Sequence, residues 1–304
     1  MPCYAAIDVG TNSVKFHIGE RREDGTWRTV ADRAEITRLG EGLEKSGEIN
    51  REAMARTVST IAAMVDEARR NAVAGIAAVG TMGMRTARNS EQFIDAVRQR
   101  CGVRIEVIPG EEEGRLAYLA VKSGLRLEEG SLAVFDTGGG STQFTFGRGT
   151  VVEERFSLNV GAVRYTERYG LAEAVSPGQL RAALDAISAD LARLGTRHSP
   201  DVLVGMGGAV TNIAAVKHAL ANYDPDIVQG TVIERTEIER QIELYCSRSQ
   251  EDRRKIVGLQ PKRADVILAG ACIVMTVMDK LSKKALSVSD RGLRHGLLID
   301  RFSN

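Results

Sequence analysis

Two short segments of the chain each place an acid and hydroxyl side chains around a glycine turn. The first, "IDVGTNS", carries Asp8, and the second, "FDTGGGST", carries Asp136. Glycines let the backbone approach a ligand and point several N–H groups at one spot, which suits an anion. An acid at a strand end can hold Mg²⁺, directly or through water, while the hydroxyls reach the same anion. The residues expected to contact phosphate in these turns are Gly10, Thr11, Asn12, Ser13, Gly138, Gly139, Gly140, Ser141 and Thr142.

A third glycine turn occurs later in the chain, in "VGMGGAVTNIAA". Gly207 and Gly208 stand there just before a helix that we expect to begin near Thr211, and a helix N-terminus is a further phosphate-type position. Purely structural glycines are the alternative explanation of each turn. Three such turns around one site favour a polyanionic ligand, most simply a phosphate chain.

The first two turns belong to an internal repeat. "YAAIDVGTNSVKFHIG" and "LAVFDTGGGSTQFTFG" both read as an apolar strand, an acid–x–glycine turn, a hydroxyl and a second alternating strand. A hairpin turn is predicted after each copy, at "REDGT" and at "GRGT". The interval between the copies is the same for the pairs Asp8/Asp136, Gly10/Gly138, Ser13/Ser141 and Gly19/Gly147.

Beyond the hairpins, both halves alternate between helix and strand patterns. The first half is predicted to contain a helix at 51–70, a strand in "AGIAAVG", a helix near 90–101, a strand in "VRIEVIPG" and a helix from Glu111. The second half is predicted to contain a helix at 177–194, a strand in "DVLVGM" and the helix near Thr211. The stretch "ADVILAGACIVMTVMDKL" reads as a core helix, and "SDRGLRHGLLIDRF" reads as a closing helix.

This order of elements predicts two related α/β domains with mixed sheets that meet at a cleft lined by the glycine turns. We expect the domains to cover residues 1–126 and 127–304, with the closing helix a candidate to pack back on the first domain.

The composition suits a soluble globular protein of two domains. The 304 residues are 43% hydrophobic and 27% charged, with a formal net charge of +1. This charge gives no global attraction to nucleic acid, and no apolar run approaches the ~18 residues of a membrane helix. We therefore expect a cytoplasmic protein without nucleic-acid or membrane partners. The four cysteines and four histidines are scattered without metal-ligand spacing, so neither a zinc site nor a histidine-based nucleophile is expected.

Several blocks of the sequence, in order along the chain, resemble the exopolyphosphatase and guanosine-pentaphosphate phosphohydrolase (Ppx/GppA) family of the actin/Hsp70/sugar-kinase superfamily. These blocks are "AAIDVGTNSVKF", "VGTMGMRTARN", "VIPGEEEGRLAYLAV", "VFDTGGGSTQF", "SLNVGAVRYTERY", "GMGGAVTNIAA", "PKRADVILAGACIV" and "SVSDRGLRHGLL". The resemblance implies two ribonuclease H-like (actin-like ATPase) domains with an interdomain cleft and a Mg²⁺ or Mn²⁺ cofactor. The family's long members carry an additional helical region, so this chain resembles the short, two-domain form. The resemblance to the family also implies a homodimer.

The resemblance further implies roles for particular charged residues. Glu113, the last acid of "GEEEGR", matches the family's catalytic base. Glu111 and Glu112 fit the ordinary preference for acids at a helix N-terminus. Arg85, in "GTMGMRTARN", matches the arginine that contacts phosphate and is our first choice for an electrostatic clamp on the terminal group.

Four other arginines are weaker candidates. Arg88 follows Arg85 on the same turn, and Arg115 is expected to hold its helix or to position neighbouring acids rather than to touch substrate. Arg164 and Arg263 could contact phosphate from the second domain, although solvated helix faces explain both equally well.

The expected metal ligands are Asp136, which has the strongest family match, Asp8, which is weaker, and Gln143. Gln143 departs from the family, which commonly has Glu at this position. An amide keeps an oxygen donor but removes one negative charge, so Mg²⁺ should bind more weakly. Three outcomes are open: an enzyme that needs more Mg²⁺, a substrate that brings its metal already bound, or binding without turnover. Another departure, His295, stands where the family more often has Glu and is assigned no role.

The favoured function is an exopolyphosphatase that removes terminal orthophosphate from inorganic polyphosphate. Its nearest rival is a phosphohydrolase that converts guanosine pentaphosphate to the tetraphosphate. An ATP-dependent kinase would need an acceptor site and its own base, and the sequence indicates neither. The non-enzymatic alternative, motivated by Gln143, is a sensor of polyphosphate or guanosine penta- and tetraphosphate.

Overall fold

The computed structural model describes residues 1–23, 25–125, 127, 130–149 and 151–303. The chain divides into two compact units, Met1–Ala120 with Leu293–Asn304, and Val121–Gly292. The expected boundary after residue 126 lies outside the described residues. The closing helix belongs to the first unit rather than to the second.

The first unit is built on a mixed sheet of five strands. In spatial order these are β3 (Trp27–Ile36), β2 (Ser13–Arg21), β1 (Cys3–Val9), β4 (Gly75–Gly80) and β5 (Glu106–Val107). The first three strands along the chain pair antiparallel, whereas β4 and β5 run parallel to β1. The helices are α1 (Leu43–Ser46), α2 (Arg51–Arg70), α3 (Met82–Thr86), α4 (Ser90–Cys101), α5 (Gly110–Leu125), which belongs to this unit as far as Ala120, and α13 (Leu293–Phe302).

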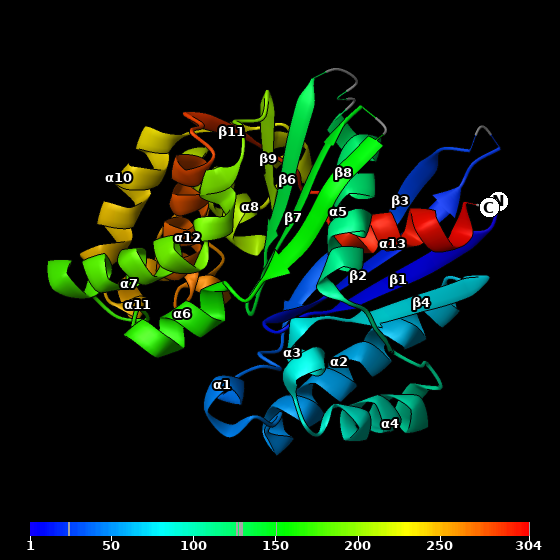
Figure 1. The fold of residues 1–304 in the computed structure, drawn as a ribbon. Helices are drawn as coiled ribbons and strands as arrows, with labels where there is room; N and C mark the ends of the chain where they lie inside the picture. Colours follow the sequence, from blue (N-terminus) through cyan, green and yellow to red (C-terminus); the bar gives the residue numbers. More distant parts are fainter. Residues whose placement is uncertain (24, 126, 128–129, 150, 304) are drawn as a thin grey trace. The chain divides into compact units, whose positions relative to one another are not determined.

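Helices cover both faces of this sheet, because β1 alternates between two apolar cores. Ile7 and Val9 belong to the core that includes α2 and α4. Ala6 points the other way and shares a core with Leu297 of α13. Figure 1 shows α2 below the blue strands and the red helix α13 on the opposite face. Only glycine fits at position 296 of α13, since a Cβ there would lie 1.9 Å from the carbonyl oxygen of Leu116 in α5.

The second unit has a mixed sheet of six strands. In spatial order these are β10 (Val232–Glu234), β11 (Ala285–Val288), β9 (Val202–Met206), β6 (Ser131–Thr137), β7 (Thr142–Arg148) and β8 (Val151–Leu158). The longer helices are α6 (Ala162–Tyr169), α7 (Pro177–Asp190), α8 (Gly208–Lys217), α10 (Arg235–Cys246) and α12 (Ile267–Lys280). The short helices are η1 (Ala192–Thr196), α9 (Pro225–Val228), α11 (Gln250–Arg253) and η2 (Pro261–Arg263).

Helix α12 is the centre of the second unit's core. It is apolar on nearly every side, as a helix must be when other elements surround it, and it contacts α6, α7, α8 and α10 (Figure 1). Among the helices of the described residues, none combines the length and the apolar character needed to cross a membrane.

The two units repeat one topology, which confirms the predicted duplication and the mixed-sheet α/β fold. Strands β3-β2-β1-β4 of the first unit correspond to β8-β7-β6-β9 of the second. The turn hydrogen bond from Gly10 N to Ser13 O (3.0 Å) recurs from Gly138 N to Ser141 O (2.9 Å). Both second strands shift register at the corresponding place, next to Gly19 in β2 and next to Gly147 in β7.

Most predicted elements are confirmed, with three corrections. The helix expected near Thr211 begins at Gly208, since the glycine turn itself becomes the helix N-terminus. The helix expected over 177–194 ends at Asp190 and continues as the 3₁₀ turn η1. The strand expected in "VRIEVIPG" is only Glu106–Val107. The two predicted hairpin turns contain residues 24 and 150, which lie outside the described residues.

A fully buried arginine fastens the loop after α6 to the core of the second unit. The guanidinium and Nε of Arg253 donate to the carbonyl oxygens of Leu171, Ala172, Glu173, Tyr245 and Ala264. Burial lowers its pKa, yet each of its three nitrogens has at least one carbonyl acceptor. Arg253 is therefore structural.

Arg253→Met is expected to lower the free energy of unfolding by roughly 3 kcal/mol, because several buried carbonyl groups lose their donors together. Urea denaturation measures this loss. The exposed neighbour Arg254 provides the control, and Arg254→Met should change stability by less than about 0.5 kcal/mol. Equal effects of the two substitutions would contradict the role of Arg253.

Candidate functional site

In the second unit, Asp136 and the third glycine turn lie side by side. Asp136 is near the end of β6 and pairs in register with Met206 at the end of the parallel strand β9, so the residue after Met206 stands next to the carboxylate. Gly207 has φ +89°, and a Cβ there would lie 2.4 Å from Asp136 Oδ1. Both facts require glycine at this position.

The guanidinium of Arg263 packs against the same turn. A Cβ on Gly208 would lie 2.2 Å from Arg263 Cζ, so the arginine lies against the first residue of α8. Arg263 is 8% exposed, and its Nε donates to Gln260 Oε1 at 3.1 Å. In turn, Gln260 N donates to Oδ1 of Asn212 in α8 at 2.8 Å, which fastens this segment to the helix.

This position is electrostatically unusual. Burial lowers the pKa of Arg263 and outweighs the opposing effect of the nearby Asp265, and no ion pair joins Arg263 to a carboxylate within the part of the chain that the structure describes. A cation near the N-terminus of α8 is repelled by the helix dipole. An anion at this point would interact favourably with both charges, so the arrangement of Arg263 and α8 suits a phosphate group.

The backbone of the triple-glycine turn is held in place by α6. The first N–H groups of α6 donate to the turn's carbonyls, from Ala162 N to Gly138 O at 3.0 Å and from Val163 N to Gly139 O at 2.9 Å. Thr142 is fully buried, and its hydroxyl donates to Val160 O at 2.6 Å. The hydroxyl proton of Thr142 is therefore used inside the unit, unlike the role in phosphate binding that we expected for it.

Gln143 stands opposite Asp136 across the β6–β7 pair. Its amide Nε2 donates to Ser141 Oγ at 2.6 Å and to Ser157 Oγ at 3.2 Å. The amide hydrogens are thus directed to two hydroxyls, and the carbonyl oxygen is the atom suited to a cation. Asp136, Gln143 and Ser141 offer a donor set of oxygen atoms, which is the kind that Mg²⁺ prefers.

The corresponding pair in the first unit is different. Asp8 stands opposite Lys15 across β1 and β2, and Lys15 Nζ lies 3.1 Å from Asp8 Oδ2. Lys15 therefore occupies the place that Gln143 has in the second unit. Since the ammonium group already neutralises Asp8, the carboxylate of Asp136 is better suited to a cation. The sequence analysis missed Lys15, although the constant interval of the repeat could have identified it.

Backbone hydrogen bonds hold the first glycine turn in place within the first unit. Thr11 O accepts a hydrogen bond from Gly40 N at 2.8 Å, and Asn12 O accepts from Thr37 N at 3.1 Å. A Cβ on Gly83 of α3 would lie 3.2 Å from Thr11 Oγ1, so α3 approaches the turn closely. Asp8, Thr11, Asn12 and Ser13 are all buried.

Arg85 and Glu113 are joined by an ion pair, although 27 residues separate them in the chain. Arg85 lies on α3, which follows β4, and Glu113 lies in the first turn of α5, which follows β5. One nitrogen of Arg85 donates both to Glu113 Oε1 and to Ile108 O, the latter at 2.7 Å. Glu113 is 5% exposed. The helices that follow the parallel strands β4 and β5 therefore place a buried carboxylate and its cationic partner next to each other.

The neighbouring acids of Glu113 have other partners. Glu111 is exposed. Glu112 accepts two hydrogen bonds from Arg115, which also donates to Asp300 Oδ1 of α13 at 2.6 Å. The hydrogen bonds that Arg115 donates to Glu112 raise its pKa further above the ordinary value. Arg115 thus joins α5 to α13. Arg88 donates to Ser46 O and Glu48 Oε1 at the surface.

The chain is thus a duplicated α/β protein with two acid-and-glycine turns and a buried carboxylate paired with an arginine. Residues 20–304 match the model of the Ppx/GppA phosphatase family. The chain belongs to that family.

Known proteins of this family are similar over the whole chain. A Ppx/GppA family member from Aquifex aeolicus has a crystal structure with a TM-score of 0.83 and 32% identity, covering 98% of this chain and 97% of that one. Exopolyphosphatase 1 of Mycobacterium tuberculosis (strain H37Rv) is 29% identical over 98% of this chain and 88% of its own length.

Two longer relatives also match. The guanosine-5'-triphosphate,3'-diphosphate pyrophosphatase of Photobacterium profundum is 29% identical over 99% of this chain, which spans 60% of that protein. The bifunctional 3-dehydroquinate synthase/phosphatase of Fusobacterium nucleatum is 28% identical, and this chain spans 46% of its length.

Proposed function

We propose that the chain hydrolyses phosphoanhydride bonds and releases terminal orthophosphate from inorganic polyphosphate by metal-assisted attack of water. The observation that carries this proposal is the Arg85–Glu113 pair, a buried carboxylate fixed by a cation in a chain whose glycine turns suit phosphate. Such a carboxylate can accept a proton from an attacking water molecule. Membership of a phosphatase family supports the same reaction type.

The proposed roles follow from the local geometry. Glu113 is the general base, and Arg85 positions it. In the second unit, Asp136 and Gln143 would hold Mg²⁺ or Mn²⁺, which supplies charge neutralisation for the phosphate oxygens. Arg263 and the N-terminus of α8 would bind a phosphate group of the chain. Phosphoryl transfer depends chiefly on such positioning and charge stabilisation. A base, a metal site and phosphate-binding groups are the kinds of group that the reaction requires.

The second candidate substrate is guanosine pentaphosphate. It stays a candidate because the pyrophosphatase and the exopolyphosphatase are equally similar to this chain, each at 29% identity. Turnover of polyphosphates of defined length and of guanosine pentaphosphate by one preparation tests the choice. We expect the higher kcat/KM with polyphosphate. A higher value with guanosine pentaphosphate would reverse the assignment, and binding of either compound without phosphate release would favour a sensor.

Gln143→Glu is expected to lower the Mg²⁺ concentration for half-maximal activity several-fold, because the substitution adds a negative charge opposite Asp136. The hydroxyls of Ser141 and Ser157, which accept from the amide, can rotate to donate to a carboxylate instead. A Mg²⁺ titration of phosphate release measures the effect. An unchanged titration curve would remove position 143 from the metal site.

A further inference from the structure

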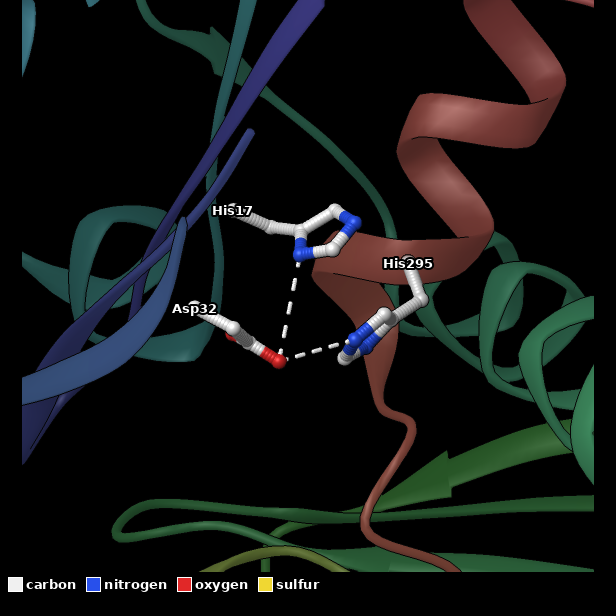
Figure 2. Close-up of side chains that lie close together, drawn as sticks. All are labelled: His17, Asp32 and His295. Carbon is white, nitrogen blue, oxygen red and sulfur yellow. Dashed lines mark ion pairs between the residues drawn. The ribbon is translucent and has the colours of Figure 1, made fainter. Parts of the chain in front are cut away.

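Two of the four histidines lie close together in the first unit, although one stands near each end of the chain. His17 belongs to β2, His295 belongs to α13, and their ring centroids are 4.4 Å apart. The carboxylate of Asp32, in β3, faces both rings, as Figure 2 shows. Its Oδ2 is 3.0 Å from His295 Nε2 and 3.8 Å from His17 Nδ1. This cluster is separate from the residues proposed for hydrolysis.

The three groups have the chemistry and spacing of a metal site. The two imidazole nitrogens and the carboxylate oxygen all lie within 4.8 Å of one another. Zn²⁺ binds such atoms at about 2.0–2.1 Å, so the ligand atoms of a tetrahedral site are roughly 3.3 Å apart. The distances from Asp32 Oδ2 to the two ring nitrogens, 3.0 and 3.8 Å, bracket that value, and rotation of the imidazole rings brings the nitrogens to it.

Arg294 prepares the carboxylate for this role. Its Nε donates to Asp32 Oδ1 at 2.5 Å, and its terminal nitrogen donates to Oδ2 at 3.0 Å, which fixes the carboxylate plane. Hydrogen bonds of this kind commonly orient metal-ligating carboxylates. Burial alone would raise the pKa of Asp32, but the charge of Arg294 and the hydrogen bond from His295 outweigh it and hold this pKa well below its ordinary value. Asp32 is therefore ionised at neutral pH.

The same arginine restricts which cation can bind. Its charge balances that of Asp32, so an ion that depends on negative charge alone, such as Mg²⁺ or Ca²⁺, gains little here. Neutral imidazole nitrogens bind Zn²⁺ and similar transition metals well. The histidine side chains are 4% and 10% exposed, and that of Asp32 is 19% exposed, so the ligands are held in place while the carboxylate remains in reach of solvent.

We propose that His17, Asp32 and His295 bind a transition-metal ion of the Zn²⁺ type, which ties the closing helix α13 to strands β2 and β3. His17 coordinates through Nδ1 and His295 through Nε2, each as the neutral tautomer with its proton on the other ring nitrogen. The Nε2 proton that His295 now directs at Asp32 is displaced by the metal and released to solvent, and the ring keeps its other proton on Nδ1. No oxidation or reduction is involved.

The test uses the full chain, stripped with a chelator and then titrated with Zn²⁺ while the histidine side chains are observed by NMR. We expect one Zn²⁺ per chain, with shifts of the His17 and His295 ring signals but not of His198 and His218, and no response to Mg²⁺. The thermal midpoint should rise by about 4 °C when the free Zn²⁺ concentration exceeds Kd about 100-fold. Both measurements use the wild-type chain, so neither depends on the folding of a variant.

Variants provide the second arm of the experiment. His17→Gln and His295→Gln should each abolish the stabilisation by Zn²⁺, whereas His198→Gln, at an exposed position, should keep it. The proposal is overturned if Zn²⁺ leaves the midpoint and the ring signals unchanged, if it shifts the signals of His198 or His218 instead, or if the His17 and His295 variants respond like the wild type.

Discussion

Glu113→Gln is expected to lower the rate of orthophosphate release from polyphosphate by roughly 10²–10⁴-fold while binding of polyphosphate is largely kept. The substitution preserves the size of the side chain and its place beside Arg85, but it removes the group that accepts the proton of water. The measurement is kcat in saturating Mg²⁺, together with Kd for a polyphosphate of defined length.

A matched control comes from the same helical turn. Glu111 is exposed and is assigned no chemical role, so Glu111→Gln should leave kcat and Kd close to the wild-type values. Full activity of the Glu113 variant would remove Glu113 from the mechanism. Loss of polyphosphate binding in that variant would instead assign Glu113 to substrate binding rather than to proton transfer.

The second large effect is expected at Arg263. Arg263→Met should weaken polyphosphate binding about 10–100-fold, since hydrogen bonds to charged groups contribute about 1.5–3 kcal/mol each. Methionine preserves much of the apolar contact with Gly208. Burying a guanidinium is costly when no carboxylate pairs with it, and none among the described residues pairs with Arg263, so the same substitution should leave the free energy of unfolding unchanged or higher. Binding isotherms and urea denaturation together measure the two quantities.

The neighbouring exposed residue Lys262 supplies the control for Arg263. Lys262→Met removes one positive charge from the same 3₁₀ turn and should weaken binding only slightly. If Arg263 instead served to hold the segment in place, Arg263→Met would lower stability and leave the affinity for polyphosphate unchanged. That outcome would contradict the assignment of Arg263 to phosphate.

Local patterns in the sequence predicted much of the fold. The repeat around Asp8 and Asp136 fixed the strand–turn–strand units, because acid, glycine and hydroxyl positions recur at one interval. Helices with clear periodicity, such as α2 and α4, were predicted with their ends at the right residues. The start of α8 was placed too late, since Gly207 and Gly208 were interpreted as a loop preceding the helix rather than as its beginning.

The side-chain contacts were harder to predict, because most join residues that are distant in the sequence. Nothing in the local pattern pairs Arg85 with Glu113, and the expected contact of Arg85 with phosphate stays a prediction. The cluster of His17, Asp32 and His295 was missed for the same reason. Histidine spacing along the chain argued against a zinc site, yet the packing of α13 on β2 brings two histidines together. Only the pairing of Asp8 with Lys15 could have been read from the repeat.

The central claim, that water attacks the terminal phosphorus of polyphosphate, is tested most directly by turnover in water labelled with heavy oxygen. The purified full chain, polyphosphate and Mg²⁺ are incubated without any other acceptor, and the released orthophosphate is analysed by mass spectrometry. The account predicts one heavy oxygen atom in each orthophosphate released by a single cleavage. Tight binding of polyphosphate with no labelled orthophosphate would contradict it.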